Sequence, residues 1–331
     1  KLSPMQAYNW AGTGSLMGVG ESTAAPEPYD LNTNRQEYST EISVKDRIRV
    51  NRLADLWLGL RSSHIQRDSQ RTDGSRATHD DRTITTPWVA FSHKLPYNAT
   101  GYASYGQGVE AQVTPNRSRY TNAGEALPSA KSTQKELGIK GAQGPWLWNA
   151  ALFDITRPVW GDQGACEEDN SCTRKLDGIA QHKGLELGMG YRSHQWKIDT
   201  ATTWLDAKRS QALINPFQNG QRPLNVPSLV LRAAAEYRWT QLPGLRTTLR
   251  LSHEGQRDLL EGGAMTLPAW TTADLAAHYS TKVAGQNTDW TLALENASNR
   301  AYWRESPKQF GHYYLYAGAP RNLRLTVRTL F

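Results

Sequence analysis

Alternation of apolar and polar residues with a period of two is the feature that most limits what this chain can fold into. It is clearest over residues 322–329, and 55–61, 185–192 and 246–252 repeat it. Successive side chains of a β-strand point to opposite faces, so this pattern predicts strands that each have one apolar face. No long stretch shows the 3.6-residue period of an amphipathic helix.

The segments between the predicted strands alternate between short and long. Short turns occur at 50–52, 94–98, 141–145, 192–195, 241–244 and 283–288, and most contain Gly, Pro or Asn. The long polar connections are predicted at Glu21–Arg35, Gln66–Asp81, Glu110–Ala130, Arg157–Ala180, Ser210–Arg222, Leu259–Leu267 and Tyr302–Tyr313. This series predicts about 14 strands, with short turns at one end and long connections at the other.

The aromatic composition suggests where such strands would lie. The 331 residues include 12 Trp and 14 Tyr but only 5 Phe, and the longest apolar run, Tyr313–Ala317, is far shorter than the roughly 18 residues of a membrane-spanning helix. Trp and Tyr favour boundaries between apolar and aqueous surroundings. An all-β transmembrane antiparallel barrel accounts for these features. The alternative is a soluble all-β protein whose aromatic residues lie in its core or bind carbohydrate.

Several motifs together resemble the C-terminal part of the β-barrel of TonB-dependent receptors, in particular the siderophore receptors. In family order they are Tyr102–Glu110, Leu127–Gly141, Asn149–Thr156, His182–Leu187, Trp204–Ala207, Arg222–Pro227, Leu267–Asp274, Leu294–Tyr302 and Gly318–Phe331. The terminal aromatic residue, Phe331, looks like the family's outer-membrane insertion signal.

The resemblance implies that residues 1–331 are one domain, a C-terminal part of the barrel. About 14 strands would be present of the roughly 22 in the family's plugged barrels, so that Lys1 enters at the ninth. No segment resembles the family's N-terminal plug or its TonB box. The alternative is a complete, passive 14-stranded pore.

In the family, a ferric siderophore meets the long extracellular connections and the upper inward faces of the strands. The resemblance therefore implies Arg61, Arg257, Trp303, Tyr313 and Tyr314 as substrate-binding residues. The two tyrosines also fit an interfacial aromatic girdle, for which Trp146, Trp148, Trp239 and Trp290 beside short turns are further candidates. Arg324 and Arg328 are predicted to fill the lumen or to pair with carboxylates such as Glu295.

The two cysteines, Cys166 and Cys172, lie in a polar acidic segment with no nearby histidine. A disulfide in a loop is favoured over a free pair, since a zinc site needs more ligands and a thioredoxin motif needs two intervening residues. A disulfide would imply an oxidising compartment.

Other chemistry has weak support in the sequence. Histidines such as His93, His182 and His253 are dispersed, and no catalytic set is indicated, so we expect no enzyme. Acidic clusters at 80–81 and 167–169 lack the ligand spacing of a calcium loop. The net charge of +7 comes from arginines spread over alternating strand faces, which argues against a nucleic-acid partner.

The resemblance implies part of a receptor for TonB-dependent uptake of a ferric siderophore, a multi-pass protein of the outer membrane of a Gram-negative bacterium. Its expected partners are the ferric siderophore, TonB through an N-terminal region that is missing here, outer-membrane lipid, lipopolysaccharide and the barrel assembly machinery. We expect no cofactor or bound metal, because iron would be carried as the ligand.

Overall fold

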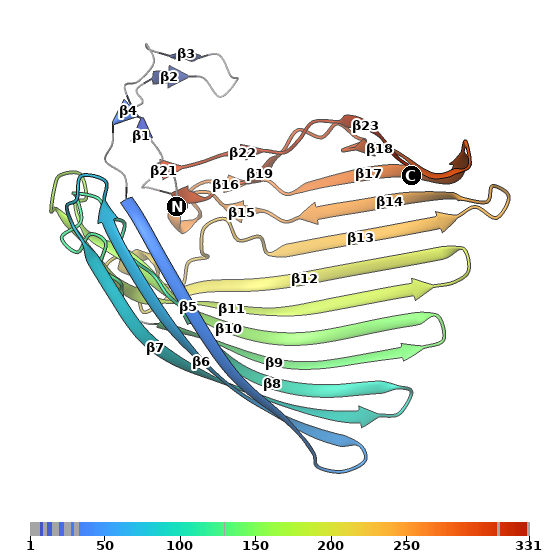
Figure 1. The fold of residues 1–331 in the computed structure, drawn as a ribbon, viewed down its shortest axis with the longest axis horizontal. Coiled ribbons are helices and arrows are strands. Elements are labelled where there is room, and N and C mark those ends of the chain that lie inside the picture. The colour runs from blue at the N-terminus through green and yellow to red at the C-terminus, as the bar shows by residue number, and fades with distance from the viewer. Residues whose placement is uncertain are drawn as a thin grey trace.

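The structure is a computed structural model that describes residues 33–128, 130–309 and 312–329, together with short strands within residues 7–29. Its main feature is one 13-stranded sheet, ordered β5 to β14, β17, β18 and β23 (Figure 1). The strands are β5 (Thr33–Arg49), β6 (Ala54–Arg71), β7 (Thr78–Leu95), β8 (Ala99–Glu110), β9 (Ala130–Gln143), β10 (Trp146–Gly164), β11 (Cys172–Arg192), β12 (Trp196–Ser210), β13 (Leu229–Arg238), β14 (Leu245–Glu254), β17 (Trp270–Val283), β18 (Gln286–Glu295) and β23 (Asn322–Thr329).

The remaining elements are short. They are β1 (Ala7–Tyr8), β2 (Gly12–Gly14), β3 (Gly20–Ser22), β4 (Pro28–Tyr29), β15 (Arg257–Asp258), β16 (Thr266–Leu267), β19 (Trp303–Glu305), β20 (Lys308–Gln309), β21 (His312–Tyr313), β22 (Tyr316–Ala317) and the 3₁₀ helices η1 (Pro216–Gln218) and η2 (Glu261–Gly263). In the described part of the chain, no helix is long and apolar enough to cross a membrane.

Every strand of the main sheet runs antiparallel to its neighbours, and each pairs with the next main-sheet strand along the chain. The short turns lie at one end of the strands, on the right in Figure 1, and the long connections lie at the other end. The predicted all-β meander and its alternating connections are therefore confirmed. The predicted count of about 14 strands exceeds the sheet by one, because it includes a strand before Glu21, where only short strands are described.

One face of the sheet is apolar. Directly opposed residues point to the same face, and one row of them crosses nine strands as Ile48, Leu56, Phe91, Ala103, Leu137, Leu152, Leu185, Trp204 and Leu229. A second row continues as Ala235, Leu249, Leu275, Leu294 and Leu323. Many of these side chains are exposed, as Leu152 is at 56% and Leu323 at 66%. A soluble sheet would cover such a face, so its exposure fits contact with lipid.

Aromatic residues border this apolar face at its short-turn end. The ring centroids of Trp146 and Tyr191 are 4.7 Å apart, as are those of Trp196 and Tyr237. Trp290 on β18 lies opposite Tyr279 on β17. This arrangement is the one expected for the girdle tryptophans Trp146 and Trp290.

The opposite face is polar and carries ion pairs between neighbouring strands. Arg324 Nη2 lies 3.0 Å from Glu295 Oε1, which confirms the predicted pairing of this arginine. Arg328 lies opposite Asp289 on the same strand pair. Tyr102 on β8 donates a hydrogen bond of 2.5 Å to Glu136 on β9. Because each strand has one apolar and one charged face, a shift of register by one residue would bury charge on the apolar side.

Two of the predicted long connections are wrong in their bounds. Gln66–Asp81 is mostly strand, with only residues 72–77 between β6 and β7, and Arg157–Ala180 leaves only 165–171 between β10 and β11. The apolar alternation stops before these strands end, but backbone pairing continues. Cross-strand ion pairs replace apolar contacts there, as between Arg67 and Glu37 at 2.6 Å.

The described strands form an open sheet and not a closed barrel. β5 and β23 lie at its two edges, and no described strand pairs with their outer sides. β5 is exposed along its whole length. The sheet therefore has the twist and faces of a barrel wall, with two edges that can accept further strands.

Candidate functional site

A cavity of about 520 Å³ lies among the long connections. Its walls come from the ends of β10 and β11, the β12–β13 connection, η2 and Lys308 of β20. Its charged lining residues are Asp162, Arg174, Asp177, Arg209, Arg222, Glu261 and Lys308. Since a cavity of this volume has room for a small-molecule ligand, we treat it as the candidate binding site.

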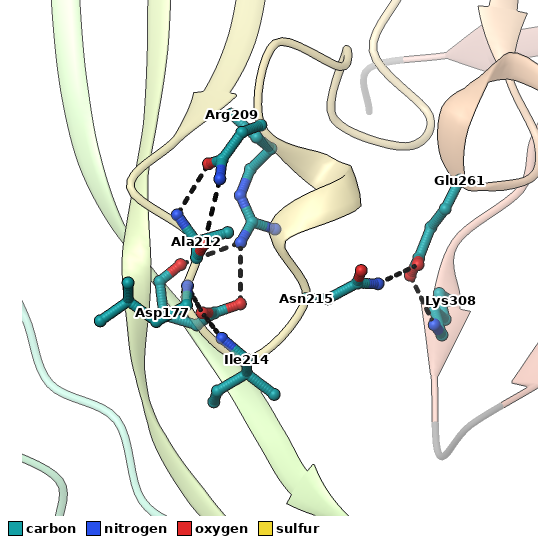
Figure 2. A network of polar contacts seen from close by, with 9 residues as sticks. Asp177, Arg209, Ala212, Ile214, Asn215, Glu261 and Lys308 are labelled. Atoms are coloured by element: carbon teal, nitrogen blue, oxygen red, sulfur yellow. Dashed lines mark hydrogen bonds and ion pairs between the residues drawn. The ribbon is translucent and has the colours of Figure 1, made fainter.

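Asp177 on β11 organises the β12–β13 connection that forms one wall (Figure 2). Its side chain is 2% exposed, and Oδ1 accepts hydrogen bonds of 2.8 Å from the backbone N–H groups of Leu213 and Ile214. Arg209 on β12 donates to the Asp177 carbonyl at 2.9 Å. One buried carboxylate therefore sets the backbone path of a loop that carries several cavity residues.

A second wall is built on Tyr120 from the β8–β9 connection. Tyr120 is 1% exposed and donates a hydrogen bond of 2.9 Å to Asp162. Arg174 binds the same carboxylate through Nε at 2.7 Å and places its guanidinium carbon 5.4 Å from the Tyr120 ring centroid. Burial, followed by the hydrogen bond to Asp162, raises the pKa of Tyr120, so the phenol stays protonated at neutral pH.

The disulfide closes a loop that is hydrogen-bonded to this second wall. Cys166 and Cys172 are joined across the short loop between β10 and β11, with their Cα atoms 4.8 Å apart. The backbone N–H of Cys172 donates to Arg119 at 3.0 Å, and the Cys172 carbonyl accepts from Thr121 at 2.8 Å. The disulfide-closed loop is thus fastened to both sides of Tyr120.

Glu261 connects three of the long connections. Its carboxylate accepts 2.8 Å and 3.3 Å hydrogen bonds from Lys308 Nζ and Asn215 Nδ2 (Figure 2). Burial raises the pKa of Glu261, but the hydrogen bond and charge of Lys308, together with Gln218 and Arg209, outweigh burial and bring this pKa below its usual value. Burial likewise lowers the pKa of Lys308, and Glu261 with Tyr313 more than reverses that effect. Both groups are therefore charged at neutral pH.

In the described residues no group of His, Cys, Asp and Glu side chains is arranged to hold a metal ion. The cavity's carboxylates are occupied by arginine, lysine and backbone donors. The cavity is therefore suited to binding a ligand through hydrogen bonds and charge.

Comparison with known proteins identifies the family. A family profile described as "TonB dependent receptor-like, beta-barrel" matches residues 5–299, which is most of the chain. The chain belongs to the TonB-dependent receptor family. Members of this family are outer-membrane β-barrel transporters, so the exposed apolar face of the sheet has an explanation in lipid.

Two curated relatives of this TonB-dependent receptor chain are also receptors by name. The ferrichrome receptor FcuA of Yersinia enterocolitica is 25% identical over 94% of the chain, and the metal-pseudopaline receptor CntO of Pseudomonas aeruginosa is 24% identical over 86%. The chain spans 41% of the length of FcuA and 40% of the length of CntO.

Solved structures share the fold of the TonB-dependent receptor chain. The ferric preacinetobactin receptor BauA of Acinetobacter baumannii superposes with a TM-score of 0.76 at 23% identity, covering 94% of this chain and 46% of BauA. The siderophore receptor PiuA of the same species gives a TM-score of 0.72 at 18% identity, with coverage of 94% and 45%. These similarities show that the sheet has the architecture of the family's barrel.

None of the five predicted substrate-binding residues lines the cavity as described. Arg61 lies on the polar face of β6, with Nη1 3.7 Å from Glu41 Oε1, far from the cavity in strand order. Trp303 lies on β19, opposite Ala317. Tyr313 lies beside a cavity residue, with its ring centroid 5.2 Å from Lys308 Nζ, and Tyr314 follows it as an exposed residue. Their roles in binding stay predictions, and Phe331 lies outside the described residues.

Arg257 on β15 has a different environment from the one expected. It is 4% exposed, its guanidinium contacts the carboxylate of Glu254, and Nη1 donates to Asn225 Oδ1 at 3.3 Å. Asn225 Oδ1 also accepts from the backbone of Ser306 at 2.9 Å. Arg257 thereby helps to hold three connections together, and any role in binding ligand is again a prediction.

Sequence reasoning missed Asp177, Arg209 and Arg222 as cavity residues. All three fall within or next to segments predicted as long polar connections, where a charged side chain is usually solvated. Arg222 precedes Pro223, and a proline restricts the backbone of the residue before it to extended conformations. This restriction was the available sign in the sequence that the backbone at Arg222 is ordered.

Proposed function

We propose that this chain forms part of the barrel of an outer-membrane receptor that imports a ferric siderophore in a TonB-dependent manner. The observation that carries the proposal is the two-faced sheet of the receptor family, whose long connections enclose a cavity rich in hydrogen-bond donors. The relatives FcuA and CntO, which are named as receptors for metal chelates, support it.

The proposal includes the partners and the cargo. TonB would act through an N-terminal part of the receptor, and lipid, lipopolysaccharide and the barrel assembly machinery would be partners of the barrel wall. Iron would be cargo within its chelate, with no resident cofactor and no catalytic role for the chain. The cell outer membrane of a Gram-negative bacterium would hold the protein, with strands crossing it repeatedly.

The test is an uptake assay with the complete product of the gene that encodes this chain. The gene is expressed in a Gram-negative host that lacks its own siderophore receptors, and uptake of radioactive iron is measured with a panel of chelates that includes ferrichrome. We expect uptake with at least one chelate, and no uptake in an otherwise identical strain without TonB.

Two outcomes would support the alternatives. Uptake that persists without TonB would indicate a passive pore. A product released from membranes by high salt, with no need for detergent, would indicate a soluble all-β protein. The family match favours the receptor over both.

A further inference from the structure

Among the charged side chains that line the cavity, one arginine has no ion-pair partner in the described residues. Four cationic side chains, Arg174, Arg209, Arg222 and Lys308, line the cavity together with three carboxylates. Asp162 pairs with Arg174 at 2.7 Å, Asp177 with Arg209 at 3.4 Å and Glu261 with Lys308 at 2.8 Å. Arg222 has neither an ion pair nor a hydrogen bond with any described residue, and it is only partly exposed.

The enclosed side-chain atoms of the cavity wall that lack a hydrogen-bond partner in the described part of the chain are donors. Nε of Arg209 and Nε1 of Trp160 are enclosed and have no partner among the described residues. The carboxylates, by contrast, each accept at least two hydrogen bonds already. The carboxylates are thus already engaged, and an anion with several acceptor oxygens would match the guanidinium of Arg222.

The backbone around Arg222 is restricted in its conformation. Pro223 restricts Arg222 to an extended conformation, and both residues line the cavity. The preceding residue, Gln221, accepts a hydrogen bond of 2.8 Å from the backbone of Arg209. The backbone that carries Arg222 therefore has little conformational freedom to lose when a ligand binds.

We propose that this cavity binds a free carboxylate of an anionic ferric chelate, and that Arg222 determines the receptor's preference for anionic over neutral chelates. The inference rests on the proposed function and adds the chemical class of the substrate. The planar guanidinium can bind a carboxylate through two parallel hydrogen bonds, which a lysine cannot reproduce.

The test measures equilibrium binding of two chelates to the purified complete receptor in detergent free of lipopolysaccharide. Ferric citrate, which keeps free carboxylates, is the anionic probe, and ferrichrome, whose hydroxamates balance the iron charge, is the neutral probe. The variants are Arg222→Gln and Arg222→Lys. Arg238→Gln is the matched control, because Arg238 is exposed at the short-turn end and has no ion pair with a described residue.

We expect Arg222→Gln to weaken ferric citrate binding by about 10- to 100-fold, the usual effect of losing a charge-assisted hydrogen-bond pair. Arg222→Lys should give an intermediate loss, and Arg238→Gln none. Ferrichrome binding should change by less than about 2-fold in every variant, because no charge is matched there. The proposal is overturned if Arg222→Gln binds ferric citrate as the unaltered receptor does, or if both chelates lose affinity equally.

The same experiment separates this inference from the proposed function. Binding or uptake of ferrichrome without any effect of Arg222 on ferric citrate would overturn the carboxylate site and leave the receptor function standing. Failure to bind or import any chelate would contradict both. Lipopolysaccharide phosphate offers similar chemistry, so it is titrated as well. If Arg222→Gln weakens lipopolysaccharide binding and not ferric citrate binding, the site belongs to lipid and the assignment to a chelate is wrong.

Discussion

At the residue scale, a few buried charges hold the long connections in place. Glu254 on β14 is bound by both Arg232 and Arg257, and Arg232 also lies over the ring of Trp270, with its guanidinium carbon 5.8 Å from the centroid. Arg257 is buried, and a buried cation that loses its carboxylate has no solvent to replace it, whereas the half-exposed Arg232 does. The stability of this end of the sheet therefore depends on single carboxylates.

Replacement of Glu254 by Gln should lower the free energy of unfolding by about 3–5 kcal/mol, because it leaves the buried Arg257, whose side chain is 5% exposed, with a neutral partner. The matched control is Glu295→Gln, since Glu295 pairs with Arg324 on the same polar face, but its side chain is 40% exposed. The control should cost less than about 1 kcal/mol. Denaturant unfolding of the complete receptor measures both, and equal costs would contradict the role of burial.

The contact between Glu261 and Lys308 should depend on pH. The pKa of the Glu261 carboxyl group in the folded protein lies below its usual value. The contribution of Glu261 to stability is therefore complete above the pKa of the unfolded state, and it is lost as the pH falls through the pKa of the folded state. The pKa of Lys308 is raised, so its contribution is lost only in strong alkali. Below about pH 4, hydrogen exchange at Trp303–Glu305 should increase beyond its intrinsic pH dependence. In Lys308→Gln this extra increase should disappear, and its persistence would contradict the proposed contact.

At the element scale, each strand has one apolar face and one polar face. Leu187 lies on the apolar face of β11, between Met189 and Leu185, and opposite Thr202 of β12. Thr203, one residue further along β12, points to the polar face and lines a hollow of about 790 Å³. Leu187 and Thr203 therefore form a matched pair of positions on adjacent strands, one on the lipid-facing side of the sheet and the other on the polar side.

Leu187→Arg should destabilise the receptor in phospholipid vesicles by about 2–4 kcal/mol, because it places a cation near the middle of the lipid-facing band. Thr203→Arg should have little effect, since water can reach its side chain. Unfolding in vesicles measures both variants. A larger cost for Thr203→Arg would mean that the two faces have been assigned the wrong way round.

At the scale of the whole molecule, stability depends on the two edges of the open sheet. Among the described residues, the outer edges of β5 and β23 have no strand partner. The interior of a bilayer offers no water to satisfy unpaired backbone groups, so lipid favours closed barrels over open sheets. The two edges of this sheet therefore need further strands.

Residues 1–331 expressed alone should accordingly fail to give a folded, heat-modifiable band on electrophoresis, whereas the complete gene product should give one. The physical reason is the cost of two unpaired edges in lipid. Channel recordings provide the second measurement. Stable, uniform conductance from residues 1–331 alone would show that the sheet can close on itself, as the passive pore requires.

The sequence determined much of the fold because strand periodicity is a local property. The apolar rows through Leu152 and Leu249 and the alternation of short and long connections could be predicted from it, since each follows from the spacing of neighbouring residues. The family was indicated separately, by the resemblance of several motifs to those of TonB-dependent receptors. The bounds of β6, β7, β10 and β11 could not, because pairing continues beyond the apolar band, where polar alternation resembles a loop.

The cavity was decided by tertiary structure alone. Asp177, Arg222 and Glu261 come from three separate segments, and only the register of the strands and the folding of the connections bring them together. Local sequence also cannot show which arginine finds a carboxylate, since Arg257 is paired and Arg222 is not. The periodicity of the chain therefore determined the sheet and its faces, whereas contacts between distant segments determined the cavity and its unmatched charge.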